Sequence, residues 1–468
     1  MSNQRARVIG AGLAGSEAAW QLASRGIEVD LYEMRGVRPT KVHHTADFAE
    51  LVCSNSLGSR ELTGASGLLK EEMRRMGSVV VGAADAHSVP AGGALAVDRE
   101  GFARGVTERV SNHPLITVHR EEITHLEGEI PTVVATGPLT SDALSAHLQE
   151  MAGRQYLYFF DAAAPILTAE SIDMSVAFRA AREGLAKRKS KKEREAEAEV
   201  APPMPEEGVG DYINCPMNKE QYEAFCRELI AGENAVLHHE EDAIFFESCL
   251  PIEVIARRGI DTLRHGPMKP MGLTDPRTGR WPYAAVQLRQ DNAVATLYNM
   301  VGFQTQLKWG EQTRIFRMIP GLENAEFVRL GVMHRNTYLN SPHLLAPTLQ
   351  WKGRPKLLVA GQMMGVEGYS DSAAMGLLAG MNLARMLKGQ DPLEFPRETM
   401  LGALSHYIAE ASEKHFQPMN ANWGLMPPLE TTIRDKRERR LKMAERALAR
   451  LDDFLAEQGE RPLVDAGH

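Results

Sequence analysis

The segment that most constrains the fold lies near the start of the chain, at residues 7–33. A short apolar run is followed by three glycines with G-x-G-x-x-G spacing: Gly10, Gly12 and Gly15. A second apolar run then ends at Glu33. This order predicts a strand, a glycine turn, a helix and a second strand. The helix N-terminus would present free N–H groups and a positive dipole end to phosphate. We therefore predict a dinucleotide-binding βαβ unit.

Each glycine has its own expected role in that unit. Gly10 permits the tight turn, Gly12 lets a pyrophosphate approach the backbone, and Gly15 lets the helix pack closely on the strand. Glu33 lies about 20 residues further on, where a carboxylate can accept hydrogen bonds from ribose hydroxyls. This segment alone does not separate FAD from NAD, and a glycine-rich turn that serves only packing has the same pattern.

Two later segments favour FAD. An apolar strand at 131–134 runs into Ala135-Thr-Gly137, a sequence that passes beside the cofactor in two-dinucleotide-binding flavoproteins. A second buried strand at 356–360 leads to a glycine turn and a helix from about Asp371, a segment that holds the flavin in FAD enzymes. Gly376 and Gly380 allow a close approach to that helix, and packing alone is the other interpretation of its small residues. The expected cofactor-binding residues are Gly10, Ala11, Gly12, Leu13, Ala14, Gly15, Glu33, Gly137, Gly361, Gln362 and Gly365.

The chain has 468 residues, enough for two or three domains. The predicted fold class is α/β, with a Rossmann-like FAD-binding domain of the two-dinucleotide-binding flavoprotein type and an inserted mixed α/β domain. We expect the FAD-binding domain to comprise residues 1–165 and 351–468, with the rest of the chain after about residue 371 helical. The insertion would comprise residues 166–350. Within it, a charged and proline-rich stretch at about 185–208 predicts an exposed excursion.

Composition and charge indicate where in the cell the protein acts and which ligands it is expected to bind. No apolar run is long enough to span a membrane, and the N-terminus has no secretory signal pattern, so we expect a cytoplasmic protein. The net charge of −8 does not favour nucleic-acid binding, although a local basic face would suffice. We expect no metal site, because the adjacent His43 and His44 cannot share one helix face.

Four cysteines occur without any C-x-x-C pair: Cys53, Cys215, Cys226 and Cys249. This spacing argues against a disulfide framework, a zinc ribbon and a dithiol redox motif. Small polar residues follow Cys53 and suit a turn or a helix start, and a helix start would favour the thiolate. A buried, inert thiol is the other interpretation of each cysteine.

Taken together, the motifs resemble the bacterial folate- and FAD-dependent tRNA (uracil-5-)-methyltransferases, from about Val8 to Pro427. Besides the glycine turn, the similar segments are Cys53-Ser-Asn55, Val89–Asp98, Ala135–Thr140, Asp161–Pro165, Asn214–Met217, Cys249–Glu253, Gly266–Pro270, Met333–Thr337 and Gly361–Tyr369. The stretch at about 185–208 and Ser248, where the family more often has glycine, depart from the pattern and put loop shape near Cys249 in doubt.

The resemblance implies an activity. FAD would be reduced by NADPH or NADH, methylenetetrahydrofolate would supply the carbon, and the product would be 5-methyluridine at position 54 of the tRNA T-loop. Because C5 of uracil is a poor nucleophile, a thiolate must first add to C6, and a base must later remove the C5 proton. The resemblance makes Cys53 and Cys249 the catalytic thiols. We assign Cys249 as the nucleophile and Cys53 as the proton acceptor, with the reverse assignment open, and expect Cys215 and Cys226 to be structural.

Other functions compete with this one. A related FAD- and folate-dependent family modifies the tRNA wobble uridine and carries a longer C-terminal helical region than this chain. A flavin-containing RNA-binding factor without turnover would not need Cys53 and Cys249. A pyridine-nucleotide disulfide reductase is excluded by the missing cysteine pair.

Overall fold

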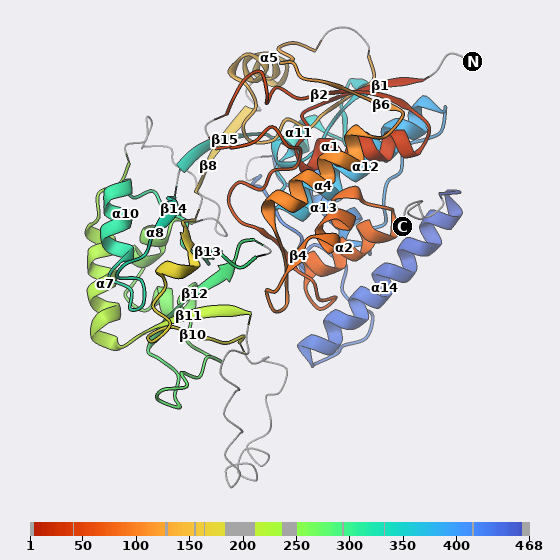
Figure 1. Ribbon diagram of the computed structural model, residues 1–468. Helices are drawn as coiled ribbons and strands as arrows, with labels where there is room; N and C mark the ends of the chain where they lie inside the picture. The colour runs from red at the N-terminus through yellow and green to blue at the C-terminus, as the bar shows by residue number, and fades with distance from the viewer. Residues whose placement is uncertain are drawn as a thin grey trace. The chain divides into compact units, whose positions relative to one another are not determined.

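The computed structural model describes residues 4–40, 42–126, 130–153, 156–162, 164–182, 211–235, 250–292, 294–331, 333–413 and 416–460. Cys249 and the 185–208 stretch lie outside the described residues. The chain forms two compact units (Figure 1). The first unit comprises Met1–Ser88, Gly93–Phe159 and Arg335–His468, and the second comprises Val89–Gly92 and Phe160–His334.

A six-stranded sheet forms the centre of the first unit. Its order is β16-β17-β7-β1-β2-β6, and every pairing is parallel except that of the edge strand β16 with β17. The strands are β16 (Gln350–Trp351), β17 (Arg354–Val359), β7 (Thr132–Val134), β1 (Arg5–Ile9), β2 (Glu28–Tyr32) and β6 (Ile116–His119). The expected α/β class with a parallel sheet is confirmed. Short strands β3 (Ser56–Ser59), β4 (Ser88–Val89) and β5 (Ala94–Val97) form a separate sheet.

Two helices in the first unit pack unusually closely. They are α1 (Leu13–Ser24) and α12 (Tyr369–Leu387). A Cβ atom on Gly376 would lie 2.1 Å from the carbonyl oxygen of Ala14, and one on Gly380 would lie 2.6 Å from that of Ala18. The close approach expected at these two glycines is confirmed, because no larger residue fits without a shift of the backbone.

The first unit contains further helices. They are α2 (Ala65–Arg75), α3 (Val79–Ala86), α4 (Arg99–Ser111), α5 (Asp142–Ala152), α11 (Ser341–Leu344), α13 (Met400–Glu410) and α14 (Lys436–Glu457). The expectation of an all-helical C-terminal region is wrong for residues 388–399 and for the described residues from 416 to 435. Prolines interrupt both stretches, and proline removes a helical hydrogen bond and clashes with the preceding turn. In the described part of the chain, no helix is both long enough and apolar enough to cross a membrane.

The second unit is built on an antiparallel sheet. Its order is β10-β11-β12-β13-β9-β14. The strands are β10 (Phe178–Arg179), β11 (Tyr212–Met217), β12 (Ala284–Gln290), β13 (Leu297–Met300), β9 (Ile166–Thr168) and β14 (Phe327–Arg329). The helices are α7 (Lys219–Ala231), α8 (Ile252–Arg257), α9 (Thr262–His265) and α10 (Trp309–Phe316). The chain passes between the units along β8 (Tyr156–Ala162) and β15 (Met333–Leu339), which pair with each other.

Two cysteines belong to the core of the second unit. Cys215 on β11 and Cys226 on α7 are 0% and 1% exposed, and both pack in its main apolar cluster. Burial raises the pKa of both thiols, so each stays protonated at neutral pH. This burial agrees with the structural role expected for them.

Candidate active site

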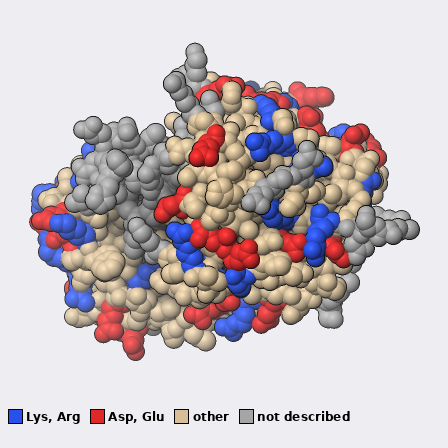
Figure 2. All heavy atoms as spheres, turned by 90° about the horizontal axis from the view of Figure 1, so that it is seen from above, with Lys and Arg blue, Asp and Glu red and all other residues tan. Residues whose placement is uncertain are grey.

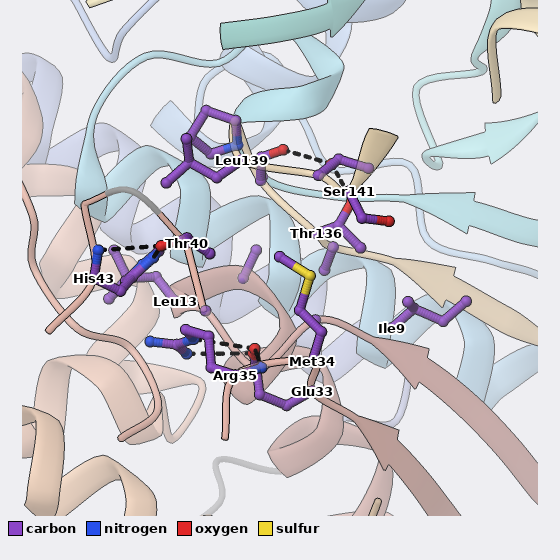
Figure 3. A pocket seen from close by; sticks show the side chains of 18 of the residues that line it. Ile9, Leu13, Glu33, Met34, Arg35, Thr40, His43, Thr136, Leu139 and Ser141 are labelled. Atoms are coloured by element: carbon purple, nitrogen blue, oxygen red, sulfur yellow. Dashed lines mark hydrogen bonds and ion pairs between the residues drawn. The ribbon is translucent and has the colours of Figure 1, made fainter. Parts of the chain in front are cut away.

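A cleft opens where the parallel strands of the first unit end. Its lining includes a residue after each of four strands: Gly10 after β1, Glu33 after β2, Gly137 after β7 and Gly361 after β17. Figure 3 shows the cleft, with Glu33, Arg35 and Thr136 among its labelled side chains. The carboxyl ends of parallel strands are the usual place for ligands in such sheets. The cleft encloses about 1010 Å³ of space outside the atoms, part of it open to solvent. Ligand pockets typically range from about 300 to 1,000 Å³.

The glycine turn has the geometry that its spacing predicts. Gly10 has φ +95°, and a Cβ atom there would lie 2.6 Å from the carbonyl oxygen of Ala135. A Cβ atom on Gly15 would lie 1.7 Å from the carbonyl oxygen of Gly10. By contrast, a Cβ atom on Gly12 would meet nothing within 4 Å. Gly10 and Gly15 are therefore required by packing, whereas Gly12 leaves space open on the lining of the cleft.

The N-terminus of α1 also faces this space. The helix begins after Gly12, which has no side chain to cap it, and its first turn carries no acidic residue. The first backbone N–H groups of a helix have no partner within the helix. Here they are available to an anionic ligand such as a pyrophosphate.

Glu33 provides the acceptor at the end of β2. Its carboxylate accepts hydrogen bonds from the backbone N–H of Ala11 at 2.8 Å and from Nε of Arg35 at 3.0 Å. Burial opposes ionisation of Glu33, but the charge and hydrogen bonds of Arg35 together with the Ala11 bond lower its pKa below the ordinary value. Glu33 is therefore ionised at neutral pH and held in a fixed orientation toward the cleft that it lines.

Arg35 is the second polar group at this end of the cleft. Figure 3 shows its side chain beside Glu33. Its Nη1 atom is buried and makes no hydrogen bond to any described residue, and its nearest ion-pair oxygen, on Glu50, is 3.7 Å away. A buried guanidinium donor without an acceptor is costly. A nucleotide cofactor, which carries many acceptor oxygens and nitrogens, would satisfy it, so the residues present fit such a group.

The structure brings most of the expected cofactor-binding residues to the cleft. Those that line it are Gly10, Gly12, Leu13, Ala14, Glu33, Gly137, Gly361 and Gln362. Three others do not line it: Ala11, Gly15 and Gly365. Ala11 orients Glu33, Gly15 packs α1 on the turn, and Gly365 leaves room for the ring of Phe416, because a Cβ atom there would lie 2.5 Å from it.

Cys53 lies in the loop that precedes β3. Asn55 holds this loop to β5, since its side-chain amide donates to the carbonyl oxygen of Val97 at 2.9 Å. The expectation of a turn at Cys53 is confirmed, and the alternative of a helix start is wrong, because the chain enters the strand at Ser56. Polar stabilisation of the thiol must therefore come from another part of the chain.

Tyr369, the first residue of α12, supplies that polar contact. Its hydroxyl oxygen lies 3.0 Å from Sγ of Cys53 and accepts from the backbone N–H of Cys53 at 2.8 Å and of Ser54 at 3.3 Å. Burial and the nearby thiol raise the pKa of Tyr369 well above its ordinary value, so it is a neutral phenol. Because its oxygen already accepts two N–H groups, its own hydrogen is directed to Sγ. Tyr369 therefore donates to the sulfur, and it also lines the cleft.

A buried lysine forms hydrogen bonds with strand β3, which follows the Cys53 loop. Lys70 on α2 is 1% exposed and donates to the carbonyl oxygens of Leu57 and Ser66, both at 2.8 Å. Burial lowers the pKa of Lys70 to about 7. Ser370, next to Tyr369, donates to the same Leu57 oxygen at 2.8 Å. Lys70 thus ties β3 to α2 at the point where the start of α12 also reaches β3.

Sequence reasoning did not assign Arg35, Tyr369 or Lys70. Tyr369 ends the family-like segment Gly361–Tyr369 and stands at the start of a helix after a glycine turn. This position could have indicated a residue of the site. Arg35 stands two residues after the expected ribose acceptor, which was a weaker signal. Nothing local in the sequence distinguishes Lys70 from a surface lysine of an amphipathic helix.

Comparison with known proteins identifies the family. The family model described as glucose inhibited division protein A matches residues 5–391. Curated relatives named methylenetetrahydrofolate–tRNA-(uracil-5-)-methyltransferase TrmFO are similar over nearly the whole length. The protein of Desulforamulus reducens is 56% identical over 458 residues, covering 98% of this chain and 99% of that relative. The protein of Desulforudis audaxviator is 58% identical over 454 residues, covering 97% and 98%. This chain belongs to the TrmFO family.

Solved structures of other proteins have a similar fold to this TrmFO family member. Two crystal forms of Aquifex aeolicus GidA superpose with a TM-score of 0.67. They are 17% and 18% identical, and the matches cover 99% of this chain and 74% and 76% of those chains. At this level of identity the likeness establishes the α/β fold and no more.

Proposed function

We propose that this protein methylates C5 of the T-loop uridine at position 54 of tRNA, with methylenetetrahydrofolate as the carbon donor and NADPH or NADH as the source of reducing equivalents. The near-complete similarity to relatives that carry this enzyme name supports the proposal. The cleft and the polar contact to Cys53 support it independently, because they place a nucleotide-type cavity next to a thiol with a hydrogen-bond donor.

The cleft is proposed to hold FAD. The backbone around Gly12 and the start of α1 would bind the pyrophosphate, and Glu33 and Arg35 would bind the adenosine end. Gly137, Gly361 and Gln362 would lie along the rest of the cofactor. When bound, FAD supplies the electrons that convert the methylene carbon of the folate into a methyl group.

The two thiols would carry out the covalent steps on uracil. The thiolate of Cys249 adds to C6, and the electron pair moves to the C4 carbonyl oxygen as an enolate, which makes C5 nucleophilic. After the new C5–carbon bond forms, the thiolate of Cys53 would take the C5 proton, and the electron pair of that C–H bond would expel the folate nitrogen, leaving an exocyclic methylene on C5. A hydride equivalent from the reduced cofactor would convert this methylene into the methyl group, and the electron pair returned to C5 would expel the Cys249 thiolate from C6 and restore the C5–C6 double bond. A hydrogen bond from Tyr369 would favour the thiolate of Cys53 and orient its sulfur for the removal of the C5 proton.

The proposal includes the division of the chain. Residues 1–165 and 351–468 would form the FAD-binding domain, and residues 166–350 would form a mixed α/β insertion. By its number, Cys249 belongs to the insertion. The protein would act in the cytoplasm, where unmodified tRNA and reduced pyridine nucleotide are both present.

The activity test uses purified protein, unmodified tRNA transcript, NADPH and methylenetetrahydrofolate labelled in the transferred carbon. We expect label at C5 of the T-loop uridine, located by nuclease mapping. A transcript in which that uridine is replaced by cytidine serves as the control and should stay unlabelled. Label at the wobble uridine would instead establish the alternative wobble-modifying function, and a protein that turns over no tRNA under these conditions would refute both.

A covalent-trapping experiment separates the two thiol roles. RNA containing 5-fluorouridine retains the adduct at C6, because fluorine cannot leave as a proton would. We expect Cys249→Ala to abolish the trapped complex and Cys53→Ala to retain it. Trapping that survives in Cys249→Ala and disappears in Cys53→Ala would reverse the assignment.

A further inference from the structure

The helix α14 changes character along one of its faces. Its last four turns bury an apolar stripe: Met443, Ala444, Ala447, Leu448, Leu451, Phe454 and Leu455. This stripe packs the helix onto the first unit beside α2, where Arg75 donates to the carbonyl oxygen of Leu448 at 3.3 Å (Figure 1). Seven residues is close to two helical turns, so positions one heptad earlier lie on the same face.

Those earlier positions are not apolar. One heptad before Met443, Ala444, Ala447 and Leu448 stand Lys436, Arg437, Arg440 and Leu441. Lys436 and Arg437 are exposed, Arg440 is half-buried, and Leu441 is 40% exposed. Over the first two turns of α14, this face is therefore cationic, and no described residue covers it. Over the later turns, the same face packs on the protein.

These cations make no salt bridge within the described part of the chain; the acidic residues of the same turn are Asp435, whose carboxylate caps the helix at the backbone N–H of Glu438, and Glu438 itself. Lys436, Arg437 and Arg440 have no ion pair there, whereas Lys442 on the opposite face pairs with Glu445 at 2.7 Å. An unpaired cluster of this kind is conspicuous in a chain with a net charge of −8. On the face drawn in Figure 2, by comparison, acidic and basic side chains are intermixed.

We propose that this cationic stripe, formed by Lys436, Arg437 and Arg440, is a docking surface for the sugar–phosphate backbone of the tRNA substrate. The inference rests on the proposed function for the identity of the RNA. A polyphosphate backbone matches three adjacent cations in charge, and Leu441 among them adds apolar contact to a ribose face. Such contacts position the RNA and carry no sequence information. The stripe would thus govern affinity and its salt dependence, leaving the chemical step unchanged.

The test compares two variants of α14 that lose the same charge. Arg437→Gln/Arg440→Gln removes two cations of the stripe, and Arg439→Gln/Lys442→Gln removes two from elsewhere on the same turns. Equilibrium binding of unmodified tRNA transcript is measured by filter retention from about 0.05 to 0.2 M salt. Methylation kinetics are measured on the same preparations, and circular dichroism verifies that both variants are folded.

We expect the stripe variant to bind tRNA about tenfold more weakly and to lower the slope of log K against log salt by about 1 to 2, because each lost phosphate contact lowers it by about 0.9. Its KM for tRNA should rise with kcat unchanged, while the control variant should match the wild type. Equal behaviour of the two variants would overturn the inference. A change confined to sedimentation behaviour would also overturn it, since the stripe would then contact a second copy of the chain. Failure of the proposed function is seen separately, as a wild-type protein that binds tRNA without methylating it.

Discussion

Replacing Tyr369 with phenylalanine should disable Cys53 without disturbing the fold. The substitution removes only the hydroxyl group, which lies 3.0 Å from Sγ and accepts the backbone N–H groups of Cys53 and Ser54. The ring of the phenylalanine can occupy the same place at the start of α12. We therefore expect flavin binding to persist and the thiol to lose its donor.

The magnitude follows from the kind of bond that is lost. A hydrogen bond to a charged group contributes about 1.5–3 kcal/mol. Since about 1.4 kcal/mol corresponds to a factor of ten, the thiolate population of Cys53 should fall by about 10- to 100-fold wherever the thiolate is the minor form. Alkylation by iodoacetamide proceeds through the thiolate, so its rate at Cys53 should fall by the same factor.

The assay follows alkylation of each cysteine by peptide mass spectrometry in the flavin-loaded protein at a fixed pH near 7. Buried Cys215 and Cys226 serve as internal standards for folding, because unfolding would expose them. Tyr407→Phe is the matched control, since the Tyr407 hydroxyl donates to the carbonyl oxygen of Gln417 at 2.9 Å, whereas the hydroxyl beside Sγ of Cys53 is that of Tyr369. An unchanged rate at Cys53 in Tyr369→Phe would refute the assignment of Tyr369 as the donor.

Four further substitutions test the cofactor turn, the packing of α12 and the buried lysine. Gly12→Ala should keep the thermal stability of the wild type and purify with little flavin, because the added Cβ atom enters only the cleft. Gly15→Ala should unfold at a lower temperature, because its Cβ atom would clash with Gly10. Absorbance at flavin wavelengths measures the cofactor content, and thermal melts measure the stability. Gly376→Ala should cost about 1–3 kcal/mol in denaturant unfolding, since its Cβ atom would lie 2.1 Å from a backbone oxygen, and an unaffected midpoint would contradict that packing argument. The pKa of Lys70 is about 7 in the folded protein, against an ordinary value of 10.5 in the unfolded chain. Between these two pH values the unfolded chain binds more protons than the folded protein. The free energy of unfolding should therefore rise with pH, by at most about 1.4 kcal/mol per pH unit. Unfolding free energies of Lys70→Met should lack this rise relative to the wild type, and parallel pH profiles would contradict it.

The parallel sheet and the glycine turn could be predicted because the signals are local. A G-x-G-x-x-G spacing between two short apolar runs is compatible with few backbone conformations. The structure shows the reason, because a Cβ atom at Gly10 or Gly15 would clash with the neighbouring backbone. A close approach at Gly376 was likewise expected from the small residues on one helix, but the sequence did not identify α1 as the partner. At such positions only glycine fits, so the residue type itself indicates the local structure.

The groups around Cys53 could not be predicted in the same way. Tyr369 reaches the Cys53 loop from a helix that begins 316 residues further along the chain, and only the three-dimensional arrangement brings it there. Lys70 lies only 13 residues after Leu57, but its burial beneath β3 depends on the packing around α2, which the local sequence does not show. The notion of a helix start at Cys53 was wrong because small polar residues suit a bend before a strand equally well. The C-terminal region was overestimated as helix, although its prolines were visible in the sequence.

The close contact of α1 and α12 has a consequence for how the protein is made. The first segment of the cleft is synthesised within the first 33 residues, but β17 and α12, which complete it, emerge only after residue 354. Until then β7 lacks its β17 neighbour, with which it pairs at Leu357–Val359, and an unpaired strand edge invites wrong pairing. At about 5–20 residues per second, the ribosome leaves this edge open for many seconds. The cofactor can therefore be loaded only after nearly all of the chain has been synthesised, and a truncated product ending before Tyr369 would have neither a closed cleft nor a donor for Cys53.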